Sequence, residues 1–583
     1  MLQTGAPVVL PVWVQQVQAW LNKGARWLVI GLAGIAILTV GLRCLRLADP
    51  NHYYLFSPDS YFFHWLAQRV MAGQGPPVGS TGANYTLQSG LAYPMAYIAK
   101  AVSYVFNLSS AESLALVAKF LPPILALVTM ILLYIGVSRI LGRRVALFAS
   151  LAWAVFYYAV IIGAGGYADR DGLSALLLLT GALLFYIFKD YHAHLGKMDV
   201  GWLPAGVGVL VVEGLLYLEW GLTGAAMLLA ILLVYVVLKL LVVYVSLMEK
   251  QPNTLRRIST TVKNLELWPL CLIAGVNIIV MAMYYHQVSL WFPYLWSAIQ
   301  ARLSVSGQVG QGAAAEVTGL TPWDLIFGFQ FFLLLIALGI YSAWKSKKDA
   351  FILFTGWFVS FAVLSLFSWR LLLYAIPAAC VVAGLGFDYL WEWRKRGAFP
   401  ISRNLVVVVL IILLLVISAN SAASLNGGSE MTVDQNWQEA LTYIRDSTPT
   451  GAVVMSQWSY GYWILDLGER TPFVDNGYYG YDPARLYDVG RVYFTSDPAE
   501  AAQIMAKCGT EYLVFAEGDL DVASSITGWA SLKDYNSFPA DSLVVRSLNG
   551  DFVSGGGLEV VFYNDEVVIL RLAGETTIGL TMQ

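Results

Sequence analysis

Long apolar runs constrain this chain more than any other feature of its sequence. A helix that crosses a bilayer needs about 20 mostly apolar residues. Eleven stretches approximately meet this requirement: 27–42, 115–138, 145–163, 172–188, 203–219, 221–245, 269–285, 324–344, 351–368, 371–390 and 404–421. The sequence therefore predicts a polytopic α-helical membrane protein, in agreement with the 58% of its residues that are hydrophobic.

The charge content excludes several other classes of protein. Only 13% of the residues are charged, and 35 Lys and Arg stand against 38 Asp and Glu. A disordered chain needs more charge and a nucleic-acid-binding chain needs a basic surface, so we expect no nucleic-acid partner. The four cysteines have no CxxC spacing, which gives no indication of a disulfide framework or a zinc site.

The charges are also distributed unevenly along the chain. From Ala422 onwards there are 8 basic and 22 acidic residues, which leaves 27 basic and 16 acidic residues before it. Lys and Arg recur in alternate short loops, such as 139–144, 345–348 and 394–396, and basic loops of this kind stay in the cytoplasm. We therefore expect a multi-pass protein of the cell membrane with a cytoplasmic N-terminus and an extracytoplasmic tail.

These patterns divide the chain into two expected domains. Residues 1–421 are predicted to form the membrane domain, with outer loops at 43–114 and 286–323. Residues 422–583 mix helical periodicity with short β-like runs, which predicts a soluble α/β domain. All of the predicted outer segments lie on the same side of the membrane as this tail.

Three carboxylates are predicted at the outer membrane surface. Asp59 follows the first apolar run, while Asp169 and Asp171 precede the fourth. Hard oxygen ligands of this kind suit Mg²⁺ or Mn²⁺ better than Zn²⁺, which prefers His or Cys. The alternative for Asp169 and Asp171 is that they only cap a helix, where an acidic first turn is favourable.

Two further charged residues are candidates on the same side. Glu316 lies in a loop rich in Gly and Ala, as in a mobile lid that carries one acid. Its alternative role is that of a solvated acid. Arg370 lies at the outer boundary between two apolar runs, where it would either extend to the lipid headgroups or hold a lipid phosphate.

The acidic tail contains an aromatic segment that could form a binding pocket. It runs from Ser456 to Trp463 and holds two Trp and two Tyr in eight residues. Aromatic walls with a few hydroxyls are typical of a small-molecule pocket, and they are equally typical of core packing. The scattered histidines, His64 among them, are expected to be structural.

In combination, these residues resemble the catalytic subunit of oligosaccharyltransferase, a GT-C membrane enzyme that glycosylates asparagine. Asp59 is similar to the Asp of that family's first outer-loop motif, and Asp169 with Asp171 is similar to its second motif. Glu316 matches the Glu that ends the third motif. Arg370 with Tyr374 matches an Arg-x-x-x-Tyr pattern beside the donor phosphates.

The tail adds one more match to that family. The family carries Trp-Trp-Asp-Tyr-Gly where this chain has, after Gln457, the residues Trp458, Ser459, Tyr460 and Gly461. One Trp and the Asp of the motif are therefore replaced. The resemblance implies a GT-C membrane domain of 11–13 spans followed by an extracytoplasmic α/β domain.

The resemblance also implies a function and a set of roles. The enzyme would transfer a glycan from a polyprenyl (pyro)phosphate to the Asn side chain of Asn-x-Ser/Thr, as a single subunit in the membrane lipid. Catalytic residues would be Asp59, Glu316 and Arg370. Asp59, Asp169 and Asp171 would bind Mn²⁺ or Mg²⁺, Arg370 and Tyr374 the donor phosphate, and the four tail residues the acceptor.

The altered acceptor motif keeps a second interpretation open. Another GT-C transferase that uses a polyprenyl-phosphate donor, with a lipid or Ser/Thr acceptor, would not need the missing Asp. A transporter is a third class, and it would favour charged or Gly/Pro-broken pairs in the middle of matching spans. Glu213 and Glu219 do not supply such a pattern.

Overall fold

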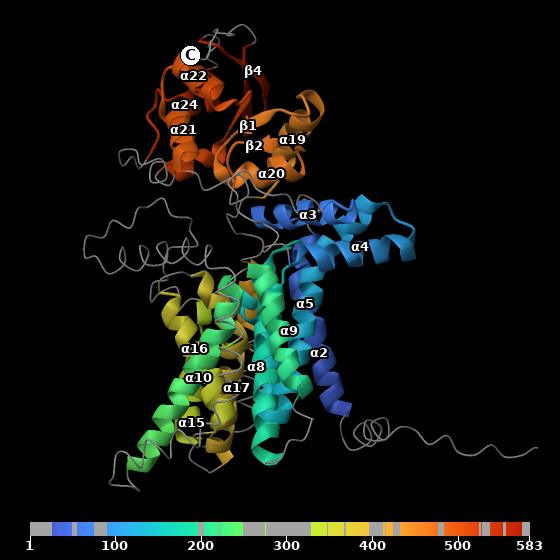
Figure 1. The fold of residues 1–583 in the computed structure, drawn as a ribbon, viewed down its shortest axis with the longest axis vertical. Helices are drawn as coiled ribbons and strands as arrows, with labels where there is room; N and C mark the ends of the chain where they lie inside the picture. The colour runs from blue at the N-terminus through green and yellow to red at the C-terminus, as the bar shows by residue number, and fades with distance from the viewer. Residues whose placement is uncertain are drawn as a thin grey trace, which may run out of the picture.

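The computed structural model describes two parts of the chain, a helical bundle and a smaller domain beyond one of its ends (Figure 1). Described residues are 26–48, 55–74, 90–195, 203–220, 222–248, 275, 328–346, 348–366, 369–395, 412–413, 415–423, 432–475, 483–523, 526, 537–551 and 556–573.

The bundle consists of helices that run along one common direction (Figure 1). They are α2 (Arg26–Cys44), α5 (Ser110–Ile140), α6 (Arg143–Val155), α7 (Tyr157–Ile161), α8 (Arg170–Leu195), α9 (Leu203–Trp220), α10 (Leu222–Met248), α15 (Phe332–Ser346), α16 (Asp349–Leu364) and α17 (Arg370–Lys395). Among the described residues, five helices are long and apolar enough to cross a membrane, and three shorter ones are apolar. The prediction of a multi-pass membrane protein is confirmed.

Two predicted spans are described only in part or hardly at all. The run 269–285 lies outside the described residues except for Gly275, and the run 404–421 is described as helix only from 412 onwards with a gap at 414. The predicted number of eleven spans therefore stays a prediction, as does the division of the chain at residue 421.

The predicted span 145–163 is not one continuous helix, so that prediction was wrong. Helix α6 ends before Phe156, whose backbone is extended at φ −64° and ψ 128°. Arg43 of α2 fills the break, and its guanidinium donates hydrogen bonds of 2.7–3.1 Å to the carbonyls of Trp153, Ala154 and Ala159. A helix can break at membrane depth when other groups bind the freed carbonyls, and a pattern of apolar residues does not reveal such a partner.

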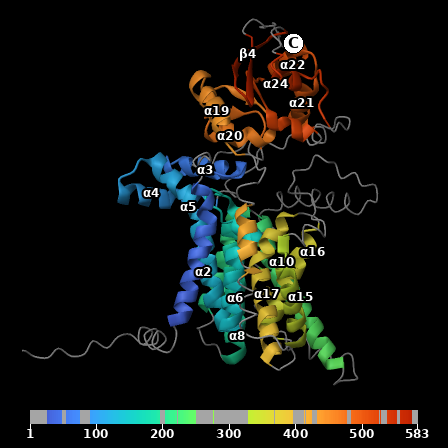
Figure 2. The same ribbon diagram turned by 180° about the vertical axis from the view of Figure 1, so that it is seen from behind.

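The predicted outer loop 43–114 contains two helices, α3 (Pro58–Met71) and α4 (Ala92–Phe106). Pro58 at the first helical position favours the start of α3, and α4 ends at Asn107 with φ 53°. Both helices lie across the end of the bundle, with α3 between the bundle and the smaller domain (Figures 1 and 2). We call this the site end.

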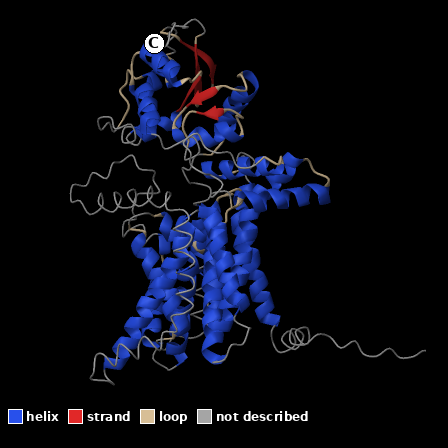
Figure 3. Ribbon diagram, in the orientation of Figure 1, coloured by secondary structure: helices blue, strands red, loops and turns tan. Residues whose placement is uncertain are grey.

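The smaller domain is built on one sheet surrounded by helices (Figure 3). Its strands are β1 (Val453–Met455), β2 (Thr471–Pro472), β3 (Tyr512–Ala516), β4 (Leu558–Tyr563) and β5 (Val567–Leu572), in the order β2-β1-β3-β5-β4. Its helices are α19 (Gln435–Ser447), α20 (Gly461–Asp466), α21 (Pro483–Phe494), α22 (Pro498–Cys508) and α24 (Leu543–Leu548). The predicted α/β fold of the tail is confirmed.

The sheet is mixed in direction, and its centre is buried. Strand β1 pairs in parallel with β2 and β3, whereas β5 pairs in antiparallel fashion with β3 and β4. All five residues of β3 are buried, as expected of a central strand covered on both faces. Strand β1 lies next to the edge strand β2 and leads directly into the segment around Trp458, which therefore leaves the sheet from a fixed position.

Candidate functional site

Three carboxylates from two separate segments converge on one arginine at the site end. Arg370 begins α17, and its Nη2 lies 3.1 Å from Oδ2 of Asp169 and 3.6 Å from Oδ2 of Asp59. Its Nε lies 3.6 Å from Oδ1 of Asp171. The structure therefore brings together four of the residues that the sequence predicted as one site.

Local backbone structure sets the position of each carboxylate. Asp59 lies in the first turn of α3, directly after Pro58 and after Ser57 with φ 73°. A positive φ is unfavourable for a residue with a side chain, and such strain is often found at functional sites. Asp171 lies in the first turn of α8, as the capping interpretation expects, but Asp169 and Asp171 also face Arg370.

Burial makes this cluster electrostatically costly. The side chains of Asp169 and Asp171 are each 1% exposed, whereas that of Asp59 is 20% exposed. Burial and the neighbouring Asp171 carboxylate raise the pKa of Asp169 well above its usual range, and Arg370 opposes the shift. Arg170, the next residue, also opposes the shift, so three carboxylates face two guanidinium groups, and protonation of Asp169 or binding of a further cation would relieve the remaining negative charge.

Tyr374 lies one turn beyond Arg370 on α17 and is directed at the same carboxylates. Its hydroxyl donates a hydrogen bond of 2.7 Å to Oδ1 of Asp171, and the residue is buried. In this structure, therefore, Tyr374 orients a carboxylate, and its predicted contact with a donor phosphate stays a prediction. Glu316, which was also predicted to belong to this site, lies outside the described residues.

The cluster has the donor chemistry for a divalent cation. Oδ2 of Asp171 is buried and accepts no hydrogen bond, and a carboxylate oxygen left in this way is available as a ligand. Within the described part of the chain, however, no three Asp, Glu, His or Cys side chains are grouped closely enough to hold a metal. The carboxylates here share Arg370 as their counter-ion.

The predicted acceptor segment forms a short 3₁₀ turn, Trp458–Tyr460, that leads into α20. Gln457 holds this turn in place, because its Oε1 accepts a hydrogen bond from the Ser459 N–H and its Nε2 donates one to the Ser459 hydroxyl, both at 3.0 Å. Trp458 and Ser459 are half-buried. We call this segment the acceptor turn.

Tyr460 is positioned differently from the other residues of the acceptor turn. It is 2% exposed, and its ring lies 4.4 Å from that of Trp437 and 5.5 Å from that of Trp463, between ring centroids. Tyr460 therefore packs in the core of the smaller domain. The accessible surface of the turn is provided by Trp458 and Ser459.

Gly461 is required by close packing. A Cβ atom on this residue would lie 2.4 Å from Cβ of Asp475 and 2.6 Å from the carbonyl oxygen of Val474. Contacts this short do not occur in proteins, so no side chain fits here. The absence of a side chain lets the segment after β2 lie directly against the start of α20.

Asp519 is a charged residue near the acceptor turn that the sequence reasoning did not identify. It is fully buried, and its carboxylate accepts a hydrogen bond of 2.8 Å from the backbone N–H of Ala516. Burial raises its pKa to about 7, although that N–H and the hydroxyls of Tyr460 and Tyr493 oppose the shift. An acid three residues after the hydrophobic strand β3 was the available sequence signal.

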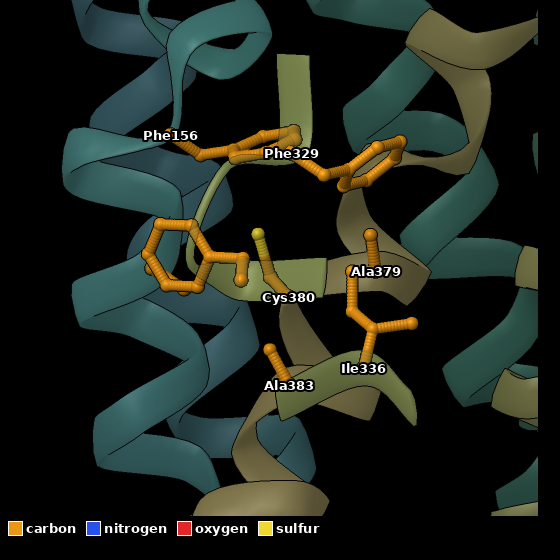
Figure 4. Close-up of a pocket in the computed structure, with 8 residues that line it drawn as sticks. Phe156, Phe329, Ile336, Ala379, Cys380 and Ala383 are labelled. Carbon is orange, nitrogen blue, oxygen red and sulfur yellow. The ribbon is translucent and has the colours of Figure 1, made fainter. Parts of the chain in front are cut away.

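A small cavity in the bundle is not part of this site. It lies between α6, α15 and α17 and is lined by apolar side chains and the Cys380 thiol (Figure 4). Its volume is about 10 Å³, which is at the lower limit for a single water molecule, and a water would also need polar partners. It is therefore a packing gap.

Comparison with known sequences gives partial matches to one group of proteins. No family model matches the chain. The dolichyl-diphosphooligosaccharide–protein glycosyltransferase subunit STT3B of Oryza sativa is 33% identical over 118 residues, which is 20% of this chain and 15% of that protein. STT3B of Arabidopsis thaliana is 24% identical over 270 residues, a match that covers 37% of this chain and 35% of that protein. The matched region thus spans about a third or less of each relative.

Comparison with solved structures covers nearly the whole chain. Archaeal oligosaccharyltransferase AglB from Archaeoglobus fulgidus, in complex with an inhibitory peptide and a dolichol-phosphate, has a TM-score of 0.66 at 16% identity over 88% of this chain and 72% of that one. That protein has also been solved tethered to an acceptor peptide with the NVT sequon, and with Zn and sulfate. ArnT from Cupriavidus metallidurans bound to undecaprenyl phosphate has a TM-score of 0.53 at 14% identity. The match covers 95% of this chain and 100% of that one.

The sequence matches and the structural matches therefore agree. Both lead to oligosaccharyltransferases, and the chain has the GT-C fold of a helical membrane domain followed by a soluble domain, which confirms the resemblance first indicated by its motifs.

Proposed function

We propose that this protein transfers a glycan from a polyprenyl (pyro)phosphate-linked donor to the side-chain amide of Asn in Asn-x-Ser/Thr acceptors, on the outer face of the membrane. One observation carries the proposal. Asp59, Asp169 and Asp171 meet Arg370 at the end of the bundle that faces the smaller domain. The chain has this arrangement in a fold that it shares with an archaeal oligosaccharyltransferase.

The chemical problem is that an amide nitrogen is a poor nucleophile, since its lone pair is delocalised into the carbonyl. A carboxylate that accepts the amide N–H bonds favours a twisted amide and makes the lone pair available. Asp59 suits this role because it is the most exposed of the three carboxylates. Glu316 is the proposed second acceptor, on the basis of the sequence motif.

Arg370 would act on the other reactant. Its side chain is 11% exposed among the carboxylates, where a phosphate leaving group that develops negative charge would find a preorganised cation. Tyr374 would support the same region through its hydrogen bond to Asp171. Arg370 and Tyr374 thereby form the proposed phosphate-binding pair.

A divalent cation, Mn²⁺ or Mg²⁺, is proposed at Asp59, Asp169 and Asp171. The excess of carboxylates over guanidinium and the unbonded Oδ2 of Asp171 support it. When bound, the cation would offset charge on the departing phosphate. The oxygen-only donor set favours these hard cations.

Trp458 and Ser459 would contact the acceptor, with the hydroxyl of Ser459 bonded to the Ser or Thr of the sequon. Tyr460 and Gly461 would hold the turn in shape rather than touch peptide. We further propose that one subunit suffices, and that the N-terminus is cytoplasmic and the smaller domain extracytoplasmic.

The test is transfer by the purified chain in lipid nanodiscs supplied with lipid-linked donor extracted from its host. We expect glycan on a peptide with Asn-x-Thr and at least tenfold less on the same peptide with Asn-x-Ala. Equal transfer to both peptides would contradict recognition of the sequon.

A chelator tests the proposed metal in the same assay. Excess EDTA should abolish transfer, and added Mn²⁺ or Mg²⁺ should restore it. Full activity in excess EDTA would exclude a metal-dependent reaction, while leaving the acceptor specificity as measured.

A second candidate is another GT-C transferase with a polyprenyl-phosphate donor and a lipid or Ser/Thr acceptor. Two observations favour it. The fold also matches ArnT, solved with undecaprenyl phosphate, over all of that chain, and the acceptor turn has Ser459 in place of the acidic residue of the family motif. Transfer to lipid but to no Asn peptide would favour this candidate.

A further inference from the structure

The two parts of the proposed site are carried by two short helices that pack against each other. Helix α3 begins at Pro58, the residue before Asp59, and α20 begins at Gly461, the residue directly after the acceptor turn. The rings of Phe62 and Tyr462 stack with centroids 4.7 Å apart and an interplanar angle of 25°. Contact between α3 and α20 therefore determines how far the acceptor turn lies from the carboxylates.

One hydrogen-bonded pair of polar side chains crosses this contact. Nδ1 of His64 on α3 lies 3.0 Å from Oδ1 and 2.9 Å from Oδ2 of Asp466 at the end of α20. The Asp466 side chain is fully buried, and that of His64 is 13% exposed. His64 follows Asp59 by five residues on the same helix, so both move together with α3.

The pair of His64 and Asp466 resists sliding of α20 along α3, which the aromatic contacts do not. Apolar burial is not directional, so stacked rings tolerate sliding of one helix along the other. A buried carboxylate, in contrast, is strongly destabilised when its partner is removed. Within the described residues, His64 is the partner of the Asp466 carboxylate, so sliding of α20 along α3 would leave that charge unpaired.

We propose that His64 and Asp466 form a positioning latch that fixes the acceptor turn relative to Asp59, so that a peptide bound at the turn presents its amide to the carboxylates. The latch rests on the function proposed above. His64 and Asp466 are positioning residues, since they act through Asp59 and the acceptor turn and touch neither reactant.

The first experiment separates peptide binding from donor binding in the nanodisc assay. His64→Phe keeps a ring but removes the hydrogen-bonding nitrogen. We expect the KM for peptide to rise at least tenfold, because a peptide held at both the acceptor turn and the carboxylates loses contacts when their separation changes, while the KM for the glycan donor stays within about twofold. His64→Asn places an N–H where Nδ1 was and should restore the peptide KM to within about threefold of the native value.

A double variant guards against simple misfolding. His64→Phe with Asp466→Asn removes the unpaired buried charge, so it should recover part of the loss seen with His64→Phe alone. Glu559→Gln is the matched control. It removes an exposed ion pair with Arg571 in the sheet, away from α3, and such pairs contribute little.

A distance measurement tests the latch without any catalysis. Spin labels at Tyr104, which is 90% exposed on α4, and at exposed Thr450 in the smaller domain report the separation of the two parts. The four native cysteines are replaced by alanine for this purpose. We expect one narrow distance distribution for the native latch and a broader or shifted one for His64→Phe.

The outcomes distinguish the latch from the proposed function. An unchanged distance distribution together with an unchanged peptide KM in His64→Phe would overturn the latch, and so would an equal rise in both KM values. If the native chain transfers no glycan to peptide, the proposed function fails, and the distance distributions alone then decide whether the pair fixes the two parts.

Discussion

The two ends of the helical bundle use carboxylates in opposite ways. At the site end, three carboxylates share Arg370. Further along α8, about 28 Å from its start at 1.5 Å per residue, Lys189 and Lys239 both pair with the single carboxylate of Asp349. The far cluster has more positive than negative charge and is closed by its own side chains.

This difference separates a structural ion cluster from a site. Buried charges are tolerated when they are paired, and Asp349 is paired twice. The site end instead holds more negative charge than its guanidinium neutralises, and it contains an unbonded carboxylate oxygen. Protonation of Asp169, whose pKa is raised by burial, or a bound cation would relieve this charge, and for this reason we assign chemistry to one end of the bundle and packing to the other.

The largest expected effect comes from neutralising one carboxylate at each end. Asp171→Asn should reduce glycan transfer on the order of a thousandfold with little change in melting temperature, because it removes a ligand charge at constant volume. Asp349→Asn should lower the free energy of unfolding by about 1–3 kcal/mol, and with it the melting temperature. It should leave turnover per folded molecule unchanged. Transfer and thermal unfolding are measured on both. Equal activity loss in the two variants would remove the distinction between the ends.

Asp519 sharpens the comparison because this buried carboxylate has no basic partner among its hydrogen bonds. Burial raises its pKa from 3.8 to about 7, so the folded state binds a proton that the unfolded state has lost, and stability falls as the pH rises from about 4 to 7. Asp519→Asn should therefore stabilise the smaller domain by about 4 kcal/mol at pH 8 and by little at pH 4. Thermal unfolding of the full chain at both pH values measures this. A stabilisation independent of pH would contradict it.

The smallest effect concerns a carboxylate that is absent. The acceptor turn has Ser459 half-buried with its hydroxyl bonded to Gln457, and a neutral partner binds a sequon hydroxyl about half as strongly as a charged one. Ser459→Asp should lower the Kd for an Asn-x-Thr peptide about tenfold, or 1.4 kcal/mol, and Trp458→Ala should raise it more than Ser459→Ala does. Peptide titration measures all three. Weaker binding by Ser459→Asp would place the hydroxyl elsewhere.

Sequence alone was sufficient to predict a helical membrane domain and to group much of the site. Apolar runs predict helices because membrane spans must satisfy their own backbone hydrogen bonds, and acids placed directly at the ends of such runs had to lie near one surface. The sequence could therefore group Arg370 with Asp59, Asp169 and Asp171. In the structure, the three carboxylates lie around the Arg370 guanidinium.

The remaining features depend on contacts between distant segments, which periodicity does not encode. The break at Phe156 depends on Arg43 from another helix. His64 was expected to be structural because the histidines are scattered along the sequence, and its partner Asp466, 402 residues away, could not be identified from the sequence. Tyr460 was assigned to the acceptor, but its aromatic neighbours enclose it in the core.

The guanidinium of Arg43 also has a consequence for how the protein is made. Helix α2 leaves the ribosome before α6 and α7 exist, so during synthesis Arg43 lacks the three carbonyls that it binds in the finished fold. A charged side chain in a span is costly in lipid, and until then it must reach towards water at the membrane surface. The hydrogen bonds that hold Arg43 inside the bundle can therefore form only after α6 and α7 have been made, so α2 cannot reach its final packing before they are.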